Sequence, residues 1–266
     1  MHGRIVVPFL LSLSLSIGCG HARSVESPKE SFVRSQTPAP PCPSLPPTES
    51  IVATNGATIV GIVCFKGIPP PMKIINFFDV NCKAMHNAPV TMDTVVVNPN
   101  GTLKNVFVYV KEGLGKRTSE PPSQPVVIEQ NGCMDQPHVS GVQVGQPVEF
   151  INNDDLMHNV HAFSKGKDVF NKGQPVQGMK FTQIFTNVEV AVKIKCDIHP
   201  WQFAYIGVVD HPYFSVTGTN GTFVLNSLPP GTYVIEAWHE KYGTQSQKVT
   251  VGEKETKGIS FEFKEP

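Results

Sequence analysis

The chain has 266 residues, in which 22 Lys and Arg balance 22 Asp and Glu, so the formal net charge is zero. Charged residues make up only 17% of the chain and form no basic stripe or acidic tail, which argues against nucleic-acid binding and against a solvating acidic segment. The 24 Pro and 22 Gly residues separate short apolar runs rich in Val, Ile, Phe and Thr. We therefore predict an all-β protein without a helix of three turns or more.

The first residues are typical of an export signal. Arg4 precedes the apolar run IVVPFLLSLSLSIG, which is too short to cross a bilayer comfortably, and Cys19 follows it. This arrangement resembles a bacterial lipoprotein cleavage box, in which the cysteine becomes the lipidated first residue, although Ser16 stands where Leu is usual. We expect residues 1–19 to form a signal peptide and lipoprotein box, with Cys19 kept as the lipidated first residue of the mature chain. The protein would then lie in the periplasm or at the cell surface, held to the membrane through Cys19. Simple secretion is the alternative.

Residues 20–50 are rich in Pro, Ser and Thr and predict a flexible or extended tether. An exported chain can form disulfides. If Cys19 carries lipid and Cys196 a metal, the remaining cysteines are Cys42, Cys64, Cys82 and Cys133, and the sequence does not fix their pairing. We favour Cys82 with Cys133, because both lie in polar, loop-like contexts. Cys64 lies in an apolar run and is a candidate buried free thiol, and Cys42 lies in the tether.

Predicted strands follow from Ala57 onward in three series. The first contains ATIVGIVCFKG and LKNVFVYV, and the second begins near Pro125 with seven short strands separated by Gly, Pro, Asn and Asp turns. Such a series is typical of a Greek-key sandwich. The third series fills residues 213–266, where Asn220-Gly221 predicts a hairpin and Pro230-Gly231 a turn.

One loop of the second series carries a set of metal-binding residue types. Cys196, His199 and Gln202 follow the strand-like run KIK at intervals of three residues, and the segment HNVH upstream supplies His158. A copper ion that exchanges one electron is served by two His and one Cys in a trigonal arrangement with a weak axial ligand, because thiolate suits Cu(I) and nitrogen suits Cu(II). We therefore predict a copper site formed by His158, Cys196 and His199, with Gln202 as the axial ligand.

Residues 125–210 resemble a cupredoxin, most closely the amicyanin and plastocyanin branch. The resemblance is carried by QPVEFINNDDLMHNVHAF and CDIHPWQ, and it implies one type 1 copper held by His158, Cys196 and His199. Amicyanins have Met where this chain has Gln202, and stellacyanin-like proteins use an axial Gln. A harder amide oxygen should favour Cu(II) and lower the reduction potential.

The neighbours of these residues have expected roles. Asn159 is expected to hold the Cys196 loop by hydrogen bonds across the site, as residues behind metal ligands commonly do. Trp201 and Phe203 are expected to cover the site, and His199 to show an edge at the surface as the electron port, within an apolar collar that includes Pro200.

Other polar residues of this region are interpreted as structural. His161 is expected to point away from the site, because it lies three residues from His158 on one strand. Asp154 and Asp155 are interpreted as a solvated turn. The pair Cys133 and His138 is interpreted as structural because no third ligand is evident. Met157 is interpreted as part of a hydrophobic collar.

The segment TNGTFVLNSLPPGTYVIEAWHEKYG resembles the carboxypeptidase regulatory-like, transthyretin-like sandwich, a family module without catalytic residues. Residues 213–266 supply too few strands for a complete sandwich. We therefore expect residues 51–120 to provide the missing strands and residues 121–212 to be an inserted cupredoxin domain. The alternative is an extended cupredoxin over residues 51–212 followed by a small domain, and contacts of the strand at 57–66 with residues 214–263 distinguish the two.

Together these features predict an exported blue copper protein that transfers single electrons to a transient redox partner protein, since redox encounters bury little area. The alternative is a copper-binding or structural module of the cell envelope without redox function. An enzyme such as a copper oxidase is not expected, because further His clusters are not visible, and we predict no catalytic residues. No nucleic-acid partner is expected.

Overall fold

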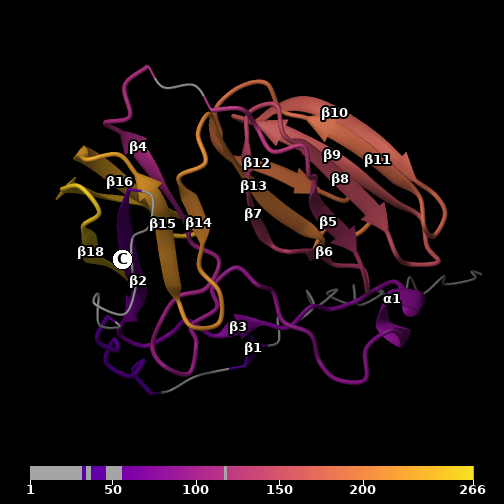
Figure 1. The fold of residues 1–266 in the computed structure, drawn as a ribbon. Coiled ribbons are helices and arrows are strands. Elements are labelled where there is room, and N and C mark those ends of the chain that lie inside the picture. The colour runs from indigo at the N-terminus through magenta and orange to yellow at the C-terminus, as the bar shows by residue number, and fades with distance from the viewer. Residues whose placement is uncertain (1–31, 34–36, 46–55, 117–118, 266) are drawn as a thin grey trace, which may run out of the picture. The chain divides into compact units, whose positions relative to one another are not determined.

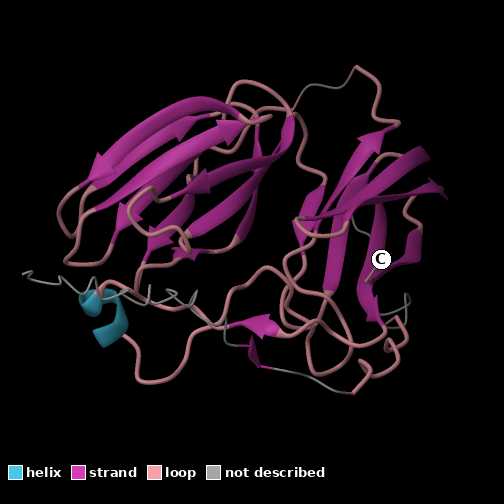
Figure 2. Ribbon diagram, turned by 180° about the vertical axis from the view of Figure 1, so that it is seen from behind, coloured by secondary structure: helices cyan, strands magenta, loops and turns pink. Residues whose placement is uncertain are grey.

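The computed structural model describes residues 32–33, 37–45, 56–116 and 119–265 (Figure 1). The predicted signal and Cys19 lie outside the described residues. Within them the chain is almost entirely strands and loops, and α1 (Val80–Ala84) is a single five-residue helix (Figure 2). This confirms the all-β prediction. No helix in the described ranges is long and apolar enough to cross a membrane.

The second series of strands forms a sandwich of two sheets. The larger sheet contains β7 (Val139–Gln143), β9 (His158–Ser164), β10 (Lys167–Gln174), β12 (Glu189–Lys195) and β13 (Phe203–Val209), in the order β10-β9-β12-β13-β7. The smaller contains β5 (Val126–Gln130), β6 (Asp135–Gln136), β8 (Pro147–Asn152) and β11 (Lys180–Ile184), in the order β11-β8-β5-β6. Alternate residues of both sheets, such as Phe150 and Ile194, share one apolar core. We call this unit the first sandwich.

The remaining strands form the second sandwich. One sheet contains β4 (Phe107–Glu112), β14 (Phe214–Val216), β16 (Gly231–His239) and β17 (Gly243–Val251), in the order β14-β4-β16-β17. The other contains β2 (Ala57–Lys66), β15 (Thr222–Leu228) and β18 (Thr256–Lys264), in the order β15-β2-β18. Their shared core includes Ile59, Phe223, Tyr233 and Phe261. These two sandwiches agree with the predicted fold class.

Strand β2 joins the two ends of the chain. It pairs antiparallel with β15 and parallel with β18, from Thr58 opposite Thr256 to Lys66 opposite Lys264. Nine of its ten residues are buried, all but Lys66, which explains why ATIVGIVCF is a continuous apolar run rather than an alternating one. This pairing is the one that an inserted first sandwich requires, while the domain boundaries at residues 121 and 212 stay a prediction.

The segment around Cys42 is attached to the second sandwich. A disulfide joins Cys42 to Cys64 of β2, and the Ala39 N–H donates a hydrogen bond of 2.8 Å to the Gly67 carbonyl. The expectation of a buried free thiol at Cys64 is therefore wrong, because a cysteine that the sequence places in the tether reaches it. The part of the predicted tether that contains Cys42 is not free.

Residues 74–92, which we call the covering segment, precede β4 in the chain and reach the loop after β5. Before them lies β3 (Met72–Lys73), which pairs with β1 (Phe32–Val33). The segment contains α1, whose N-cap Asp79 accepts a 2.8 Å hydrogen bond from the Asn81 N–H. A disulfide links Cys82 of α1 to Cys133, as the sequence favoured.

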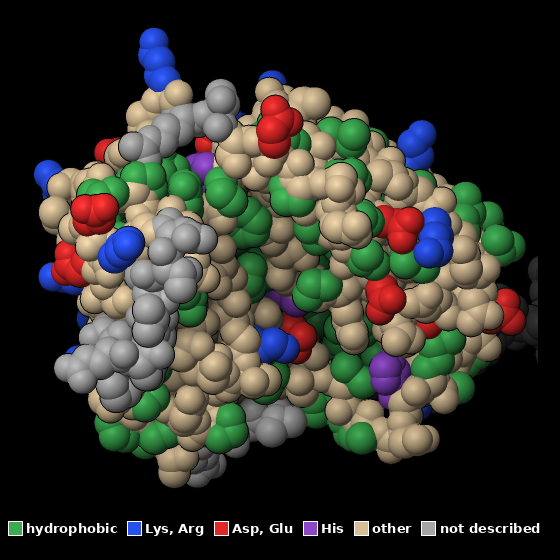
Figure 3. Space-filling model, viewed as in Figure 1, with side chains coloured by type: hydrophobic (Ala, Val, Ile, Leu, Met, Phe, Trp, Pro, Cys, Tyr) green, Lys and Arg blue, Asp and Glu red, His purple; other side chains and the backbone are tan. Residues whose placement is uncertain are grey.

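Charges of both signs are scattered over the face in Figure 3 among uncharged side chains, in keeping with the zero formal net charge. Charge alone therefore does not mark a site on this face. Buried polar residues occur in both sandwiches, and those at one end of the first sandwich include His158, His199 and Gln202.

Candidate metal centre

The four predicted ligands come from adjacent strand ends. His158 is the first residue of β9, Cys196 directly follows β12, and Gln202 directly precedes β13. Strands β9 and β12 pair, with Lys195 opposite His161, and β12 pairs with β13. Two backbone hydrogen bonds close the loop, from the Cys196 N–H to the Gln202 carbonyl (2.9 Å) and from the Gln202 N–H to the His199 carbonyl (2.8 Å). The sheet therefore brings His158 close to His199, although the two residues are 41 positions apart in the sequence.

The three predicted strong ligands converge. The Nδ1 atoms of His158 and His199 are 3.0 Å apart, and the Cys196 Sγ lies 3.7 Å from the His199 Nδ1. One ligand atom from each residue lies within 4.8 Å of the others. All three side chains are at most 1% exposed. A trigonal set of two nitrogens and one sulfur is the donor chemistry of a type 1 copper site.

The histidines favour the ionised form of the cysteine. Burial opposes ionisation of the Cys196 thiol, but hydrogen bonds with His158 and His199 outweigh it and lower the thiol pKa to about 6. Burial likewise opposes protonation of His158, but Asp154 and then Cys196 raise its pKa to about 9. Because the thiolate is the form that binds a metal, the cysteine is prepared to act as a ligand.

Asp154 is a site residue that the sequence interpretation missed. Its Oδ2 lies 3.0 Å from the Nε2 of His158, and its two oxygens accept hydrogen bonds from the N–H groups of Gly132 (2.7 Å) and Cys133 (2.8 Å). Asp154 is 4% exposed, so the expectation of a solvated turn is wrong for it, whereas Asp155 is exposed. A carboxylate on Nε2 leaves Nδ1 free to face a metal.

Asn159 has the role that its position predicts. Its Oδ1 accepts hydrogen bonds from the Asp197 N–H (2.7 Å) and from the Cys196 thiol (3.4 Å). Its Nδ2 donates to the Asp197 carboxylate at 2.9 Å. His161 points away from the site and bonds Asp197 and Asp168 instead, as expected. The Cys196 loop is therefore held from β9 by direct hydrogen bonds.

Gln202 has one end of its amide bonded and the other end free. Its Nε2 donates a 2.8 Å hydrogen bond to the Oδ1 of Asp135, and its Oε1 is buried without a hydrogen-bond partner. The Oε1 atoms of Gln130, Gln143 and Gln174 are also buried without a partner, but only Gln202 lies on the loop that carries Cys196 and His199. This free oxygen, together with the three converging ligand atoms, fits copper with an axial amide oxygen.

The covering segment buries His199, so the prediction of an exposed imidazole edge is wrong. The Trp201 ring is tilted against that of His199, with ring centroids 5.4 Å apart. The Phe77 and Phe78 rings meet Trp201 edge-on, with centroid distances of 5.2 and 4.8 Å. The Asp79 Oδ2 lies 3.7 Å from the His199 Nε2. The sequence could not show this, because the segment lies more than 100 residues before the loop.

The expected collar also differs in part. Trp201 covers the site and is 8% exposed, but Phe203 packs against His138 at a centroid distance of 5.2 Å. Pro200 is exposed, and Met157 is 53% exposed. The covering role expected of Phe203 is filled by Phe77 and Phe78.

Other donor groups near the site are already engaged. Cys82 and Cys133 lie close to His199, but they are joined in a disulfide. His138 bonds Glu240 and the Phe203 carbonyl, which agrees with its structural interpretation. Within the described ranges, the donors left for a metal here are therefore the four predicted ones.

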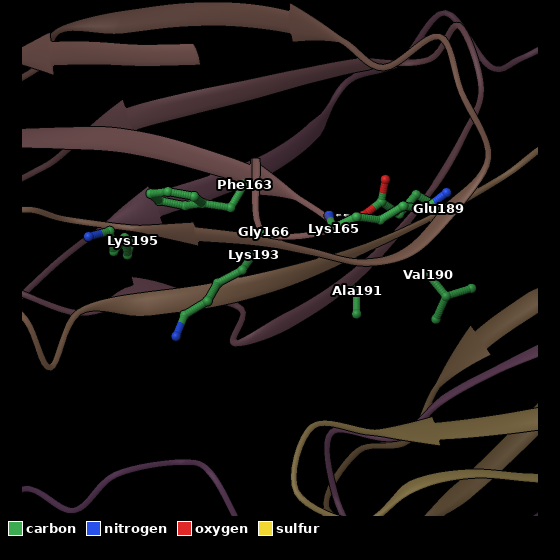
Figure 4. Close-up of a pocket in the computed structure, with 8 residues that line it drawn as sticks. All are labelled: Phe163, Lys165, Gly166, Glu189, Val190, Ala191, Lys193 and Lys195. Carbon is green, nitrogen blue, oxygen red and sulfur yellow. Dashed lines mark hydrogen bonds between the residues drawn. The ribbon is translucent and has the colours of Figure 1, made fainter. Parts of the chain in front are cut away.

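A separate open pocket of about 550 Å³ lies on the outer face of the larger sheet and is shown in Figure 4. Its lysines are partly engaged, since Lys195 pairs with Asp197 at 2.9 Å and Lys193 lies over the Phe203 ring at 4.7 Å. Glu189 accepts a hydrogen bond from the Lys165 N–H (2.9 Å). The pocket contains none of the four candidate ligands.

Residues 199–264 match the family model of the carboxypeptidase regulatory-like domain, which confirms the resemblance of the C-terminal segment. No curated protein matches the chain.

Solved structures that are similar to part of the chain are cupredoxins and a copper enzyme. They include a purple cupredoxin from Nitrosopumilus maritimus, with 24% identity over 31% of this chain and 98% of that chain and a TM-score of 0.28. A Cu-containing nitrite reductase from Thermus scotoductus SA-01 has 24% identity over 37% of this chain and 25% of that chain, with a TM-score of 0.29. A variant of amicyanin in the Cu(I) form has 18% identity over 38% of this chain and 97% of that chain, with a TM-score of 0.29.

Proposed function

We propose that the protein is an exported type 1 copper protein that carries single electrons at the cell envelope. The observation that supports this most directly is the buried convergence of His158, Cys196 and His199. Gln202, whose oxygen has no hydrogen-bond partner, lies on the same loop as Cys196 and His199. Copper bound there would supply a one-electron couple between Cu(I) and Cu(II). We further propose that Cys19 anchors the protein to a membrane and that the second sandwich has no catalytic role.

The protein's own residues prepare this site. Asp154 holds His158 through Nε2, and Asn159 holds the Cys196 loop, so two of the ligands keep their orientation with or without the metal. Trp201, Phe77 and Phe78 cover His199 and keep water away from it. A fixed, dry set of ligands needs little rearrangement when the charge of the metal changes.

The covering segment also changes where electrons can leave. Because His199 is buried, its ring cannot touch a partner, but Trp201 lies against it and Phe78 lies against Trp201. Phe78 is 66% exposed. We propose that electrons pass between His199 and a transient partner protein through Trp201 and Phe78.

The test uses the soluble form that begins at Ser24, loaded with Cu(II). We expect an intense visible charge-transfer band from thiolate to copper and narrow copper hyperfine splitting in EPR. Cys196→Ala should abolish both, because it removes the thiolate that produces them, while Ala in place of exposed Ile198 should leave them unchanged. A pale spectrum with ordinary splitting in the wild type would overturn the proposal.

A second candidate function is the holding or delivery of copper without redox cycling. The burial of His199 under the covering segment favours it, since an enclosed ion exchanges electrons less readily. Reversible bleaching and recovery of the visible band on reduction and reoxidation would exclude it. Copper that is released on reduction would support it instead.

A further inference from the structure

Asp135 is a buried carboxylate behind the candidate axial ligand. It is the first residue of the short strand β6, where it lies opposite Gln130 of β5, and it is 6% exposed. Its Oδ1 accepts a 2.8 Å hydrogen bond from the Nε2 of Gln202 and lies 3.5 Å from the Nε2 of Gln130. Buried carboxylates are uncommon and usually have a specific partner, which here is the amide of Gln202.

The chemistry of the two groups fixes the orientation of the amide. An ionised carboxylate can only accept hydrogen bonds, whereas the Gln amide donates through nitrogen and accepts through oxygen. The NH₂ group of Gln202 must therefore face Asp135. Since nitrogen and oxygen are attached to the same planar carbon, the oxygen is turned away from Asp135, and only the oxygen is a useful metal ligand.

The oxygen of Gln202 is not used by any hydrogen bond. The Oε1 of Gln202 is buried and has no hydrogen-bond partner, and Gln202 itself is 0% exposed. The Oε1 atoms of three other buried glutamines, Gln130, Gln143 and Gln174, also have no partner. What distinguishes Gln202 is its place on the loop that carries Cys196 and His199, together with the bond from its Nε2 to Asp135. The arrangement satisfies the donor end of the amide and leaves its acceptor end available to a cation.

We propose that Asp135 is a positioning residue that sets the axial ligand of the copper site by turning the oxygen of Gln202, and not its nitrogen, toward the metal. This inference rests on the proposed function and goes beyond it, because it assigns the choice of axial atom to a residue that does not touch the metal. The short stretch from Cys133 to Asp135 then orients two ligands. Asp135 orients Gln202, and the Cys133 N–H holds Asp154, which in turn holds His158.

The test compares two substitutions of Asp135 in the copper-loaded soluble form. Asp135→Leu has the same branching but a larger side chain without an acceptor, so nothing holds the Gln202 NH₂ group. We expect altered EPR rhombicity and a shifted reduction potential. Asp135→Asn keeps one acceptor oxygen that can hold the Gln202 NH₂ group, so it should restore the wild-type EPR rhombicity. Its potential should differ only through the loss of one negative charge.

The same Asp135→Leu substitution in a Gln202→Met variant shows whether Asp135 acts by orienting Gln202 or in some other way. In Gln202→Met the axial ligand is a thioether that Asp135 cannot orient, so adding Asp135→Leu should leave the EPR rhombicity of that variant unchanged. An equal change in rhombicity in both backgrounds, or no change in either, would overturn the inference. The double-mutant comparison isolates the interaction between the two residues.

NMR of the wild type provides a measurement that does not depend on the folding of Asp135→Leu. In the diamagnetic Cu(I) form, the side-chain carbonyl ¹³C resonance of Gln202 should shift on metal loading, while its NH₂ protons stay protected from hydrogen exchange. An unshifted carbonyl in a protein that shows the type 1 spectrum as Cu(II) would overturn this inference alone. Absence of the type 1 spectrum in the wild type would overturn the proposed function and the inference with it.

Discussion

The core of the second sandwich and the candidate metal centre are both buried, but they are built from opposite kinds of side chain. The core contains Phe223, Tyr233 and Phe261, each at most 2% exposed, and the Tyr233 hydroxyl donates to the Pro229 carbonyl at 2.6 Å. The centre buries imidazole, thiol and amide groups, and the Oε1 of Gln202 has no partner. The first arrangement gains stability from apolar burial, whereas the second bears the cost of buried polar atoms.

This difference predicts that stability and metal binding depend on different residues. Substitutions in the apolar core should change stability and leave the metal chemistry of folded molecules unchanged. Substitutions behind the ligands should change metal binding more than stability.

Phe223→Ala should lower the free energy of unfolding by about 3–5 kcal/mol, because it removes a fully buried ring from the core and leaves a cavity. Chemical denaturation monitored by circular dichroism measures the loss. Val224→Ala, next to it on β15 but 37% exposed, is the matched control and should have a small effect. Altered copper EPR in folded Phe223→Ala would contradict the separation of the two regions.

Asp154→Asn should reduce copper affinity by roughly 10–100-fold, the usual effect of losing a residue that orients a metal ligand. An amide has one acceptor oxygen in place of the two that serve Gly132, Cys133 and His158. Competition with a chelator measures the affinity. Asp155→Asn, at the exposed neighbour, should bind copper as the wild type does, and equal losses in the two variants would refute the role of Asp154.

His239, at the end of β16, should make the protein acid-sensitive. Burial, with smaller contributions from His138 and Lys241, lowers its pKa from 6.5 to about 4. Because the unfolded chain binds this proton at higher pH than the folded one, stability falls as the pH drops below 6.5, by about 2 kcal/mol at pH 5. The loss continues down to the folded-state pKa, below which this contribution is constant.

The pH effect can be isolated with His239→Asn, whose oxygen can still accept the hydrogen bond that the Lys241 N–H gives to His239. Unfolding curves at pH 7 and pH 5 should differ by about 2 kcal/mol less in this variant than in the wild type. His86→Asn is a comparison at a partly exposed histidine. An unchanged pH dependence in His239→Asn would exclude His239 as the cause.

Phe78→Ala should slow electron exchange with an external redox partner several-fold and leave the reduction potential unchanged. The ring contacts Trp201 and not the ligands, so its loss lengthens the electron path without altering the metal environment. Stopped-flow oxidation of the Cu(I) form measures the rate. Val80→Ala, also exposed on the covering segment, should behave as the wild type, and an equal slowing in both variants would place the exit elsewhere.

The parts of the site that depend on local spacing can be predicted from the amino-acid sequence. Cys196, His199 and Gln202 lie on one short loop that two backbone hydrogen bonds close, and the sequence shows this spacing directly. The HNV motif predicts His158 and Asn159 at the start of an adjacent strand. Apolar runs such as that of β2 predict buried strands, because burial favours apolar side chains.

The distant groups that surround those ligands are visible only in the folded protein. Asp154 looked like a solvated turn, because its neighbours Gly132 and Cys133 are 22 and 21 residues away. Asp135 meets Gln202 across 67 residues, and the Cys42–Cys64 disulfide and the cover over His199 likewise join separate parts of the chain. Spacing constrains side chains within a loop or strand, but contacts between such elements depend on how the sheets pack, and residue type alone does not record that packing.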